Sequence, residues 1–376
     1  MTFDLENYLK DLEEIVNIES PSRNAAATMQ VADFLAKKFN EIGWIVEYVE
    51  VGTDVGPCLK VYNRKAEIYD VLLMGHMDTV FPLGTVAERP FSMKDNKIYG
   101  PGVVDMKTGL MYMFYVAKHL TGTEILKEAS ICLLFNSDEE ISSIHSRKFI
   151  EETAAKAACA IIVEPARANG ALVNERKGIA KYVLDFKGIS AHAGVAPEKG
   201  ASAINELFYW GVELNKLNNP ALGTTLNIGV VKGGTEPNVV AEEAQCKIDV
   251  RITDVKEAER IESRMRELQA QPQDARVSVK ISGGVVRPPL NTTKESLALC
   301  EKVTEVGKGL GIDVKWVATG GGSDGNFTSA LGIPTIDGMG PIGGNTHASS
   351  EYGEVSSILP RFTLLLETVK SIIQKQ

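Results

Sequence analysis

The sequence lacks the features that mark membrane proteins and disulfide-linked secreted proteins. No window of its 376 residues holds the roughly eighteen uninterrupted apolar residues that a membrane-spanning helix requires. The first residues, Met1–Asn7, are polar and acidic and do not resemble a secretory signal. The five cysteines are scattered and form no C-x-x-C pair, which argues against a disulfide framework and against a thiolate zinc knuckle. We therefore expect a cytoplasmic protein.

Positive charge is also scarce, because 40 Lys and Arg residues stand against 49 Asp and Glu residues, for a net charge of -9. An acidic chain does not attract nucleic acid or an anionic membrane through its overall field, so we expect neither as a partner. The glycines at 320–322 are not followed by the Lys and Ser or Thr of a phosphate-binding loop, which favours a tight backbone turn there. The length exceeds that of one typical domain and indicates two.

Short apolar runs alternate with a helical pattern in the first half of the chain. Residues 71–74, 131–135 and 160–163 are typical of strands buried on both faces, and 110–120 has the pattern of a helix. This alternation predicts an α/β fold with a mostly parallel sheet, in which ligands bind beyond the carboxyl ends of the strands. The three runs are followed there by imidazole or carboxylate side chains: His76, Asp78, Glu139, Glu140 and Glu164.

The middle of the chain has a different rhythm, in which four strand patterns and two helix patterns follow one another. The order is β-α-β-β-α-β, which predicts a ferredoxin-like unit. The expected elements are strands at 179–186, 225–231, 244–252 and 277–281 and helices at 201–217 and 255–270. We therefore predict a discontinuous main domain, 1–175 and 285–376, with a smaller domain, 176–284, inserted into it.

The histidines and carboxylates suit one kind of chemistry. Hydrolysis of an amide at neutral pH requires an activated water and stabilisation of the developing oxyanion, and two metal ions a few ångströms apart can supply both. Zinc or a similar first-row ion fits a set of imidazole and carboxylate ligands. The candidate ligands are His76, Asp105, Glu140, Glu164 and His347.

The sequence also suggests individual roles for some of these residues and for their neighbours. Asp105 lies in a Gly- and Pro-containing loop that leads into a helix, and such a loop can present a rigid bridging carboxylate. Asp78 can hold the second nitrogen of His76 and thereby fix its tautomer. Of the adjacent Glu139 and Glu140, one can bind a metal ion while the other accepts a proton from the water.

Six segments together resemble a known family, and the resemblance spans essentially the whole chain. The segments are Gly75–Pro82, Gly100–Gly109, Ser137–Glu140, Glu164–Pro165, Gly188–Gly194 and Gly320–Asp324. In order and spacing they resemble the zinc-dependent glutamate carboxypeptidase, acetylornithine deacetylase and succinyl-diaminopimelate desuccinylase family of metallopeptidases. The chain is most similar to the glutamate carboxypeptidase branch, through Glu175–Ile179 and Ser190–Gly194.

The resemblance implies two divalent metal ions per subunit, with zinc as the expected ion and cobalt or manganese as alternatives. It implies that Asp105 bridges the ions and that Glu139 is the general base. It further implies two ligand sets that share Asp105: His76, Asp105 and Glu164 for one ion, and Asp105, Glu140 and His347 for the other.

The resemblance also implies that the inserted domain is a lid through which two copies form a homodimer. His192 would reach the active site of the partner subunit and support the oxyanion there. Asn238 and Arg251 would hold the carboxylate of the substrate, a task that suits a planar guanidinium. Ala318 stands where the glutamate carboxypeptidase branch has an Arg that grips a C-terminal glutamate. A preference for glutamate is therefore not implied, and other acyl-amino acids or dipeptides stay open as substrates.

The expected function is a carboxypeptidase-like hydrolysis of an amide bond in a peptide or N-acyl amino acid, by a water activated between two metal ions with Glu139 as general base. One alternative is an aminopeptidase of di- or tripeptides. A free substrate amine would need an acidic pocket group, whereas Arg251 favours a carboxylate. The other alternative is a binding protein that kept the fold without the chemistry.

Overall fold

The computed structural model describes residues 3–374, and the chain divides into two compact units. The first unit comprises Met1–Glu175, Leu290–Thr319 and Ser323–Gln376, and the second comprises Arg176–Pro289 and Gly320–Gly322. Each unit has its own hydrophobic core. No helix within residues 3–374 combines the length and the hydropathy that a bilayer span demands.

A six-stranded sheet forms the centre of the first unit. In spatial order its strands are β1 (Ile45–Val49), β2 (Cys58–Tyr62), β6 (Ile131–Asn136), β3 (Val71–His76), β7 (Ala160–Ile162) and β14 (Thr335–Ile336). Strand β2 is antiparallel to both of its neighbours, whereas β6, β3, β7 and β14 pair in parallel. The expectation of a mostly parallel α/β sheet is thereby confirmed.

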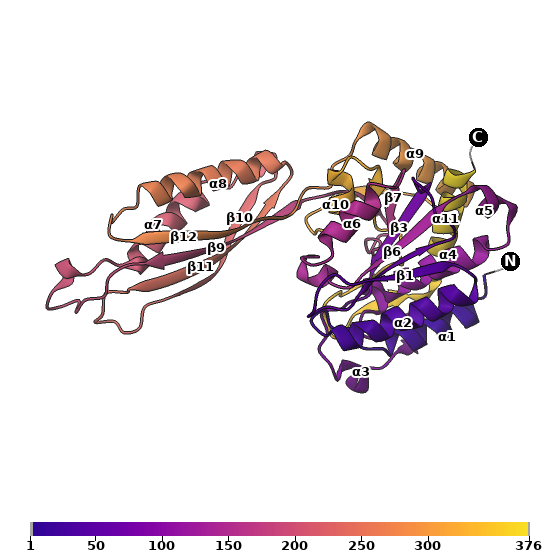
Figure 1. The fold of residues 1–376 in the computed structure, drawn as a ribbon, viewed down its shortest axis with the longest axis horizontal. Helices are drawn as coiled ribbons and strands as arrows, with labels where there is room; N and C mark the ends of the chain where they lie inside the picture. The colour runs from indigo at the N-terminus through magenta and orange to yellow at the C-terminus, as the bar shows by residue number, and fades with distance from the viewer. Residues whose placement is uncertain (1–2, 375–376) are drawn as a thin grey trace. The chain divides into compact units, whose positions relative to one another are not determined.

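Helices cover both faces of this sheet (Figure 1). Alternate residues of β3 enter different cores, because Leu73 belongs to one cluster and Leu72 to another. The larger cluster includes side chains from α1 (Leu5–Val16), α2 (Ala25–Glu41), α4 (Thr108–Leu120), α9 (Lys294–Gly309) and α11 (Val355–Ile373). The smaller cluster includes side chains from α6 (Arg147–Ala154) and α10 (Gly325–Ala330). Burial on both sides explains why the central strands are apolar throughout.

Further short elements complete the first unit. The short helices are α3 (Thr85–Glu88), α5 (Glu124–Glu128), the π-helical turn η1 (Val103–Lys107) and the 3₁₀ turn η2 (Glu139–Ile141). Strands β8 (Leu172–Arg176) and β13 (Trp316–Thr319) form a pair. A second sheet has the order β15 (Gly343–Gly344), β16 (Tyr352–Glu354), β5 (Lys97–Tyr99) and β4 (Ser92–Lys94). This sheet brings the segment around residue 347 next to the segment around residue 100.

The second unit is a ferredoxin-like domain. Its elements are β9 (Gly178–Lys187), α7 (Ala203–Asn215), β10 (Thr225–Gly233), β11 (Glu243–Ile252), α8 (Val255–Ala270) and β12 (Ser278–Arg287), with short turns η3 (Pro197–Lys199) and η4 (Pro220–Leu222). The sheet order β10-β11-β9-β12 is antiparallel throughout. Both helices pack on one face, where Tyr182 and Leu184 of β9 meet Trp210 of α7 and Ile261 of α8. The predicted β-α-β-β-α-β order is confirmed.

Candidate metal centre

Three adjacent parallel strands end at one edge of the central sheet, and each is followed by imidazole or carboxylate side chains. His76 is the last residue of β3, which lies between β6 and β7. Glu139 and Glu140 follow β6 in the turn η2, and Glu164 follows β7. Parallel strands deliver their carboxyl ends to the same edge, so residues far apart in the sequence meet there.

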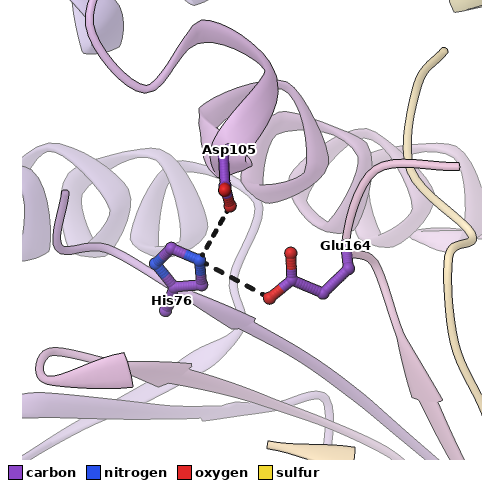
Figure 2. Close-up of side chains that lie close together, drawn as sticks. All are labelled: His76, Asp105 and Glu164. Atoms are coloured by element: carbon purple, nitrogen blue, oxygen red, sulfur yellow. Dashed lines mark hydrogen bonds and ion pairs between the residues drawn. The ribbon is translucent and has the colours of Figure 1, made fainter. Parts of the chain in front are cut away.

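The first ligand group consists of His76, Asp105 and Glu164. Nε2 of His76 lies 3.2 Å from Oδ1 of Asp105 and 3.5 Å from Oε1 of Glu164. Figure 2 shows that both carboxylates face the same nitrogen of the imidazole. The three ligand atoms lie within 4.8 Å of one another. His76 and Glu164 are buried, with only 2% of His76 exposed to solvent, and Asp105 is partly buried.

The second ligand group consists of Asp105, Glu140 and His347. Nε2 of His347 lies 3.1 Å from Oε2 of Glu140 and 3.3 Å from Oδ2 of Asp105. Asp105 therefore turns Oδ1 toward the first group and Oδ2 toward the second. One carboxylate between two imidazoles, with a further carboxylate on each side, is a donor set that fits a pair of zinc-like ions.

The pKa values of the three carboxylates in the ligand groups are shifted by burial and by the charges of their neighbours. Burial raises the pKa of Glu164 well above its ordinary value, and the charge of Asp105 adds to this effect. Burial also raises the pKa of Glu140, although a hydrogen bond with His347 acts in the opposite direction. Burial favours the neutral form of Asp105, but hydrogen bonds with His347 and His76 hold its pKa below the usual range. A cation at this place would relieve the repulsion among the three carboxylates.

Both histidines respond to the same carboxylates. Burial acts to lower the pKa of His76, but hydrogen bonds with Asp105 and Asp78 hold it well above its ordinary value. Hydrogen bonds with Asp105 and Glu140 raise the pKa of His347 to about 10. The neighbouring carboxylates thus favour the protonated form of both imidazoles, and a metal ion that binds them would compete with protons.

Asp78 connects His76 to the pair of glutamates. Nδ1 of His76 lies 2.9 Å from the backbone oxygen of Asp78 and 3.4 Å from its carboxylate oxygen Oδ1. The same carboxylate accepts hydrogen bonds from the backbone N–H groups of Glu139 and Glu140, both at 3.1 Å, and from the hydroxyl of Ser22 at 2.6 Å. Asp78 is fully buried, so this arrangement is shielded from solvent.

Glu139 begins the η2 turn and precedes Glu140, and its negative charge contributes to the raised pKa of Glu164. Glu139 is only partly buried, whereas Glu164 is buried. Its backbone N–H is bonded to Asp78, so the start of the η2 turn is fixed.

Sequence reasoning missed a second layer of polar residues. Asp324 accepts hydrogen bonds from Nδ2 of Asn136 at 2.6 Å and from the hydroxyl of Ser143 at 2.5 Å. Asp138 accepts from the backbone N–H of His145 at 2.8 Å. These bonds hold the turn after β6, where Ser143 has a left-handed φ of 52°. The sequence signal for this layer was a Ser-Asp dipeptide at 137–138 and another at 323–324, both of which are buried in the structure. Each lies in a segment that carries the family resemblance, and no supporting role was predicted for either.

Glu351 is the other residue that the sequence did not single out. Its carboxylate accepts hydrogen bonds from the backbone N–H groups of Gly102 at 3.2 Å, Val104 at 2.9 Å and Asp105 at 3.1 Å. Burial raises the pKa of Glu351 to about 7 against the effect of these donors. Because its partners lie about 250 residues earlier, no local pattern marks it.

The remaining predicted site residues belong to the second unit. The backbone oxygen of Asn238 accepts a hydrogen bond from Ala193 at 2.9 Å, and His192 forms a β-bridge with Val239. His192 and Asn238 therefore lie on adjoining loops. Arg251 lies near the carboxyl end of β11, where Nε and Nη2 bond to Asp249 at 2.7 and 3.1 Å.

Comparisons with known proteins agree with this fold. Carboxypeptidase G2 of Pseudomonas sp. (strain RS-16) is 29% identical over 378 residues, covering 97% of this chain and 89% of that protein. Aminopeptidase PepT from Bacillus cereus ATCC 10987 has a TM-score of 0.83 at 24% identity, covering 98% of this chain and 99% of that chain. The Bacillus subtilis protein YXEP, described as a dinuclear metal binding peptidase, has a TM-score of 0.71 at 14% identity, covering 99% of both chains.

The expected fold class, a parallel-sheet metallopeptidase domain with an inserted ferredoxin-like domain, is confirmed by these structural neighbours. The expected family resemblance is confirmed as well. A model of peptidase family M20/M25/M40 matches residues 72–371. Because that match covers most of the sequence, the chain belongs to peptidase family M20/M25/M40.

Proposed function

We propose that this protein is a metal-dependent hydrolase that cleaves an amide bond in a peptide or N-acyl amino acid, with Glu139 as the general base. The observation that carries the proposal is the position of Asp105, whose two carboxylate oxygens face different ligand groups. A shared carboxylate of this kind suits a pair of ions and has no comparable use in a single-ion site. The kinship to carboxypeptidase G2 supports the same reaction class.

The residues that would hold the ions fit zinc best, with cobalt or manganese as alternatives, because each group combines one imidazole with two carboxylates. Ions bound there would polarise the scissile carbonyl group and lower the pKa of a water molecule. Asp78 keeps the imidazole of His76 turned toward its partners, since it contacts Nδ1 and leaves Nε2 free for a ligand role.

Glu139 would accept the proton of the attacking water and deliver it to the leaving nitrogen. Glu139 suits this task more than Glu140. Glu140 is paired with His347 at 3.1 Å within the second ligand group, whereas Glu139 belongs to neither ligand group and its charge acts on Glu164. The hydrogen bond from its N–H to Asp78 fixes the backbone from which the carboxylate extends.

Arg251 favours a substrate that carries a carboxylate. Asp249 holds its guanidinium by two hydrogen bonds, and Nη1 donates a third to the backbone oxygen of Gly320 at 3.3 Å. These bonds fix the plane of the guanidinium and use three of its five N–H groups. The remaining groups are suited to a carboxylate, which supports a carboxypeptidase or deacylase over an aminopeptidase.

A homodimer through the second unit is part of the proposal. Strand β10 lies at an edge of the antiparallel sheet, and an unpaired edge of nine residues is a template for pairing with another chain. Val231 on β10 is 53% exposed, and Phe208 and Val212 of α7 are each 61% exposed. Gly211 of α7 faces Ile228 of β10, so this helix and this edge lie side by side. Pairing of two such edges would cover their apolar residues.

The distribution of substrate-binding candidates also supports a dimer. His192 and Asn238 lie beyond the end of the sheet where β11 begins, and Arg251 lies where β11 ends. The eight residue steps from Glu243 to Arg251 span roughly 26 Å at about 3.3 Å per residue. A dipeptide-sized substrate cannot touch both ends of one copy, so contributions from both ends to one substrate would require two copies.

The decisive experiment replaces Glu139 with alanine. We expect Glu139→Ala to retain both metal ions and to lose roughly 10²- to 10⁴-fold in kcat, the usual contribution of a positioned general base. Metal content and turnover of N-acylated and free dipeptides are measured in parallel, with Glu152→Ala on the exposed side of α6 as control. Turnover near the wild-type rate would overturn the role of Glu139. Faster cleavage of free dipeptides would favour the aminopeptidase alternative, and no turnover by the wild type with zinc, cobalt or manganese would favour a binding protein.

The dimer has its own test. Inactive His192→Ala subunits are mixed with inactive Glu139→Ala subunits, and exchange of subunits is verified by mass labelling. If His192 acts on the site of its partner, a mixed dimer contains one site with both residues intact, and part of the activity returns. Verified exchange without any return of activity would contradict action across the dimer.

A further inference from the structure

The loop that carries Asp105 is an irregular piece of backbone inside the protein. Gly102 has a left-handed φ of 71°, and Asp105 departs from helical geometry within η1. Gly102, Val103 and Val104 are buried. A buried backbone N–H without an acceptor is costly, so the donors of this loop need partners from elsewhere in the chain.

One side chain supplies an acceptor for three of these donors. Oε1 of Glu351 accepts from the N–H groups of Val104 and Asp105, and Oε2 accepts from that of Gly102. Glu351 is fully buried. The adjacent strand β16 pairs with β5, which ends at Tyr99, directly before the loop. Strand β16 begins directly after Glu351, and β5 ends just before the loop. The pairing of these two strands thus holds the Glu351 carboxylate against the loop.

We propose that Glu351 is a positioning residue that sets the orientation of the bridging Asp105 carboxylate, by holding the backbone N–H groups of the Asp105 loop. The inference rests on the proposed function, because it assigns Glu351 to the same two-ion site. The Glu351 carboxylate accepts its three hydrogen bonds from backbone N–H groups, one of which is that of Asp105, and its charge also acts on the Asp105 carboxylate. Its effect therefore passes through Asp105.

Two features distinguish this role from simple stabilisation of the fold. Asp105 belongs to both ligand groups, so a displaced Asp105 would weaken both ions together. Glu351 also follows His347 by four residues and is joined to its loop by a hydrogen bond from the Glu351 N–H to the backbone oxygen of Ala348. The same residue thereby ties the segment of one ligand to the segment of the shared one.

The test compares Glu351→Gln with the control Glu354→Gln, three residues away on β16. A glutamine has nearly the same shape, but one of its two acceptor oxygens becomes an NH₂ donor, which meets a backbone N–H instead of accepting from it. Zinc affinity at each group is measured by chelator competition, together with metal content and the melting temperature of the metal-free protein. We expect Glu351→Gln to bind zinc roughly 10- to 100-fold more weakly at both groups. Glu354→Gln should match the wild type.

Several results would overturn the inference. Unchanged zinc affinity in Glu351→Gln would do so, and so would weakening at only one group, which is the behaviour expected of His347→Ala. If Glu351→Gln does not fold, Glu351→Asp is measured, because it keeps the charge but withdraws it by one methylene. Intermediate weakening at both groups supports the inference, and wild-type affinity contradicts it. A wild-type protein that binds fewer than two ions would instead sink the proposed function itself.

Discussion

The two ligand groups share Asp105 but rest on different kinds of backbone. His76 ends a buried strand in the middle of the central sheet and is 2% exposed. The His347 side chain lies in an irregular segment between β15 and β16 and is 54% exposed. Regular structure on both sides of β3 fixes one imidazole, whereas the other depends on a surface loop. The comparison indicates that the first group is built before any ion arrives.

The backbone of the His347 loop is also conformationally expensive. His347 has a φ of 64° and Asn345 a φ of 57°, a left-handed region that few residues other than glycine occupy. The Asn345 side chain reduces this cost by donating to the hydroxyl of Ser350 at 3.1 Å. A loop that stores strain persists because its surroundings hold it. We infer that the group containing His347 binds its ion more weakly than the group containing His76.

The largest effect should come from the residue that the two groups share. We expect Asp105→Ala to lose both ions and to lower kcat/KM by at least roughly 10³-fold, because ions worth several kcal/mol of transition-state stabilisation are lost at about 1.4 kcal/mol per tenfold. Metal content by elemental analysis and steady-state kinetics measure the two effects. A variant that keeps two ions at wild-type affinity would show that Asp105 does not bridge them.

An intermediate effect should separate the groups. We expect His347→Ala to lose the ion of its own group and to keep one ion in the group of His76, Asp105 and Glu164. We expect His76→Ala to be the more damaging change, since its imidazole is buried and its loss leaves Glu164 and Asp105 without their nearest positive partner. Titration of metal-free protein with zinc gives the number of ions and their affinities. Equal losses in the two variants would remove the distinction between the groups.

The sequence predicted the group at the sheet edge because local patterns were sufficient there. Apolar runs identified β3, β6 and β7, and the rule that parallel strands present their carboxyl ends together brought His76, Glu140 and Glu164 into one place. The helix and strand order of the inserted domain was predictable for the same reason, since its strands alternate and its helices have apolar faces. The order in which the four strands pair in the sheet was not predictable in this way.

The elements that hold the His347 loop in place could not be predicted from local sequence patterns. Strands β15 and β16 are two and three residues long, too short for a periodic signal. The grouping of Asp105 with His347 was assigned from the family resemblance, and their distance depends on a contact between segments about 250 residues apart. Glu351 was missed because one buried glutamate among surface-like residues has no pattern of its own. The roles of these residues stay predictions until the variants are measured.

The smallest effect we expect is a pH dependence of ion binding in the His347 group. Hydrogen bonds with Asp105 and Glu140 raise the pKa of His347 to about 10, which lies above the ordinary imidazole value near 6.5. A raised pKa in the folded state stabilises the metal-free protein fully below about pH 6.5, and this stabilisation is lost as the pH rises through about 10. An ion that binds His347 must displace this proton. Its affinity should therefore increase by up to about tenfold per pH unit across that window.

Calorimetry at pH 8 in two buffers of different ionisation enthalpy counts the protons released per ion. We expect the more weakly bound ion to release about one proton from His347 when it binds to wild-type protein, and we expect this release to be missing in His347→Ala, which loses that ion. Because the His347 imidazole is half exposed and that of His76 is buried, the proton of His347 should also exchange with solvent faster than that of His76. Equal proton counts in the two proteins would mean that His347 binds no ion. The contrast between a preformed group and a loop-dependent group would then be wrong for the group that contains His347.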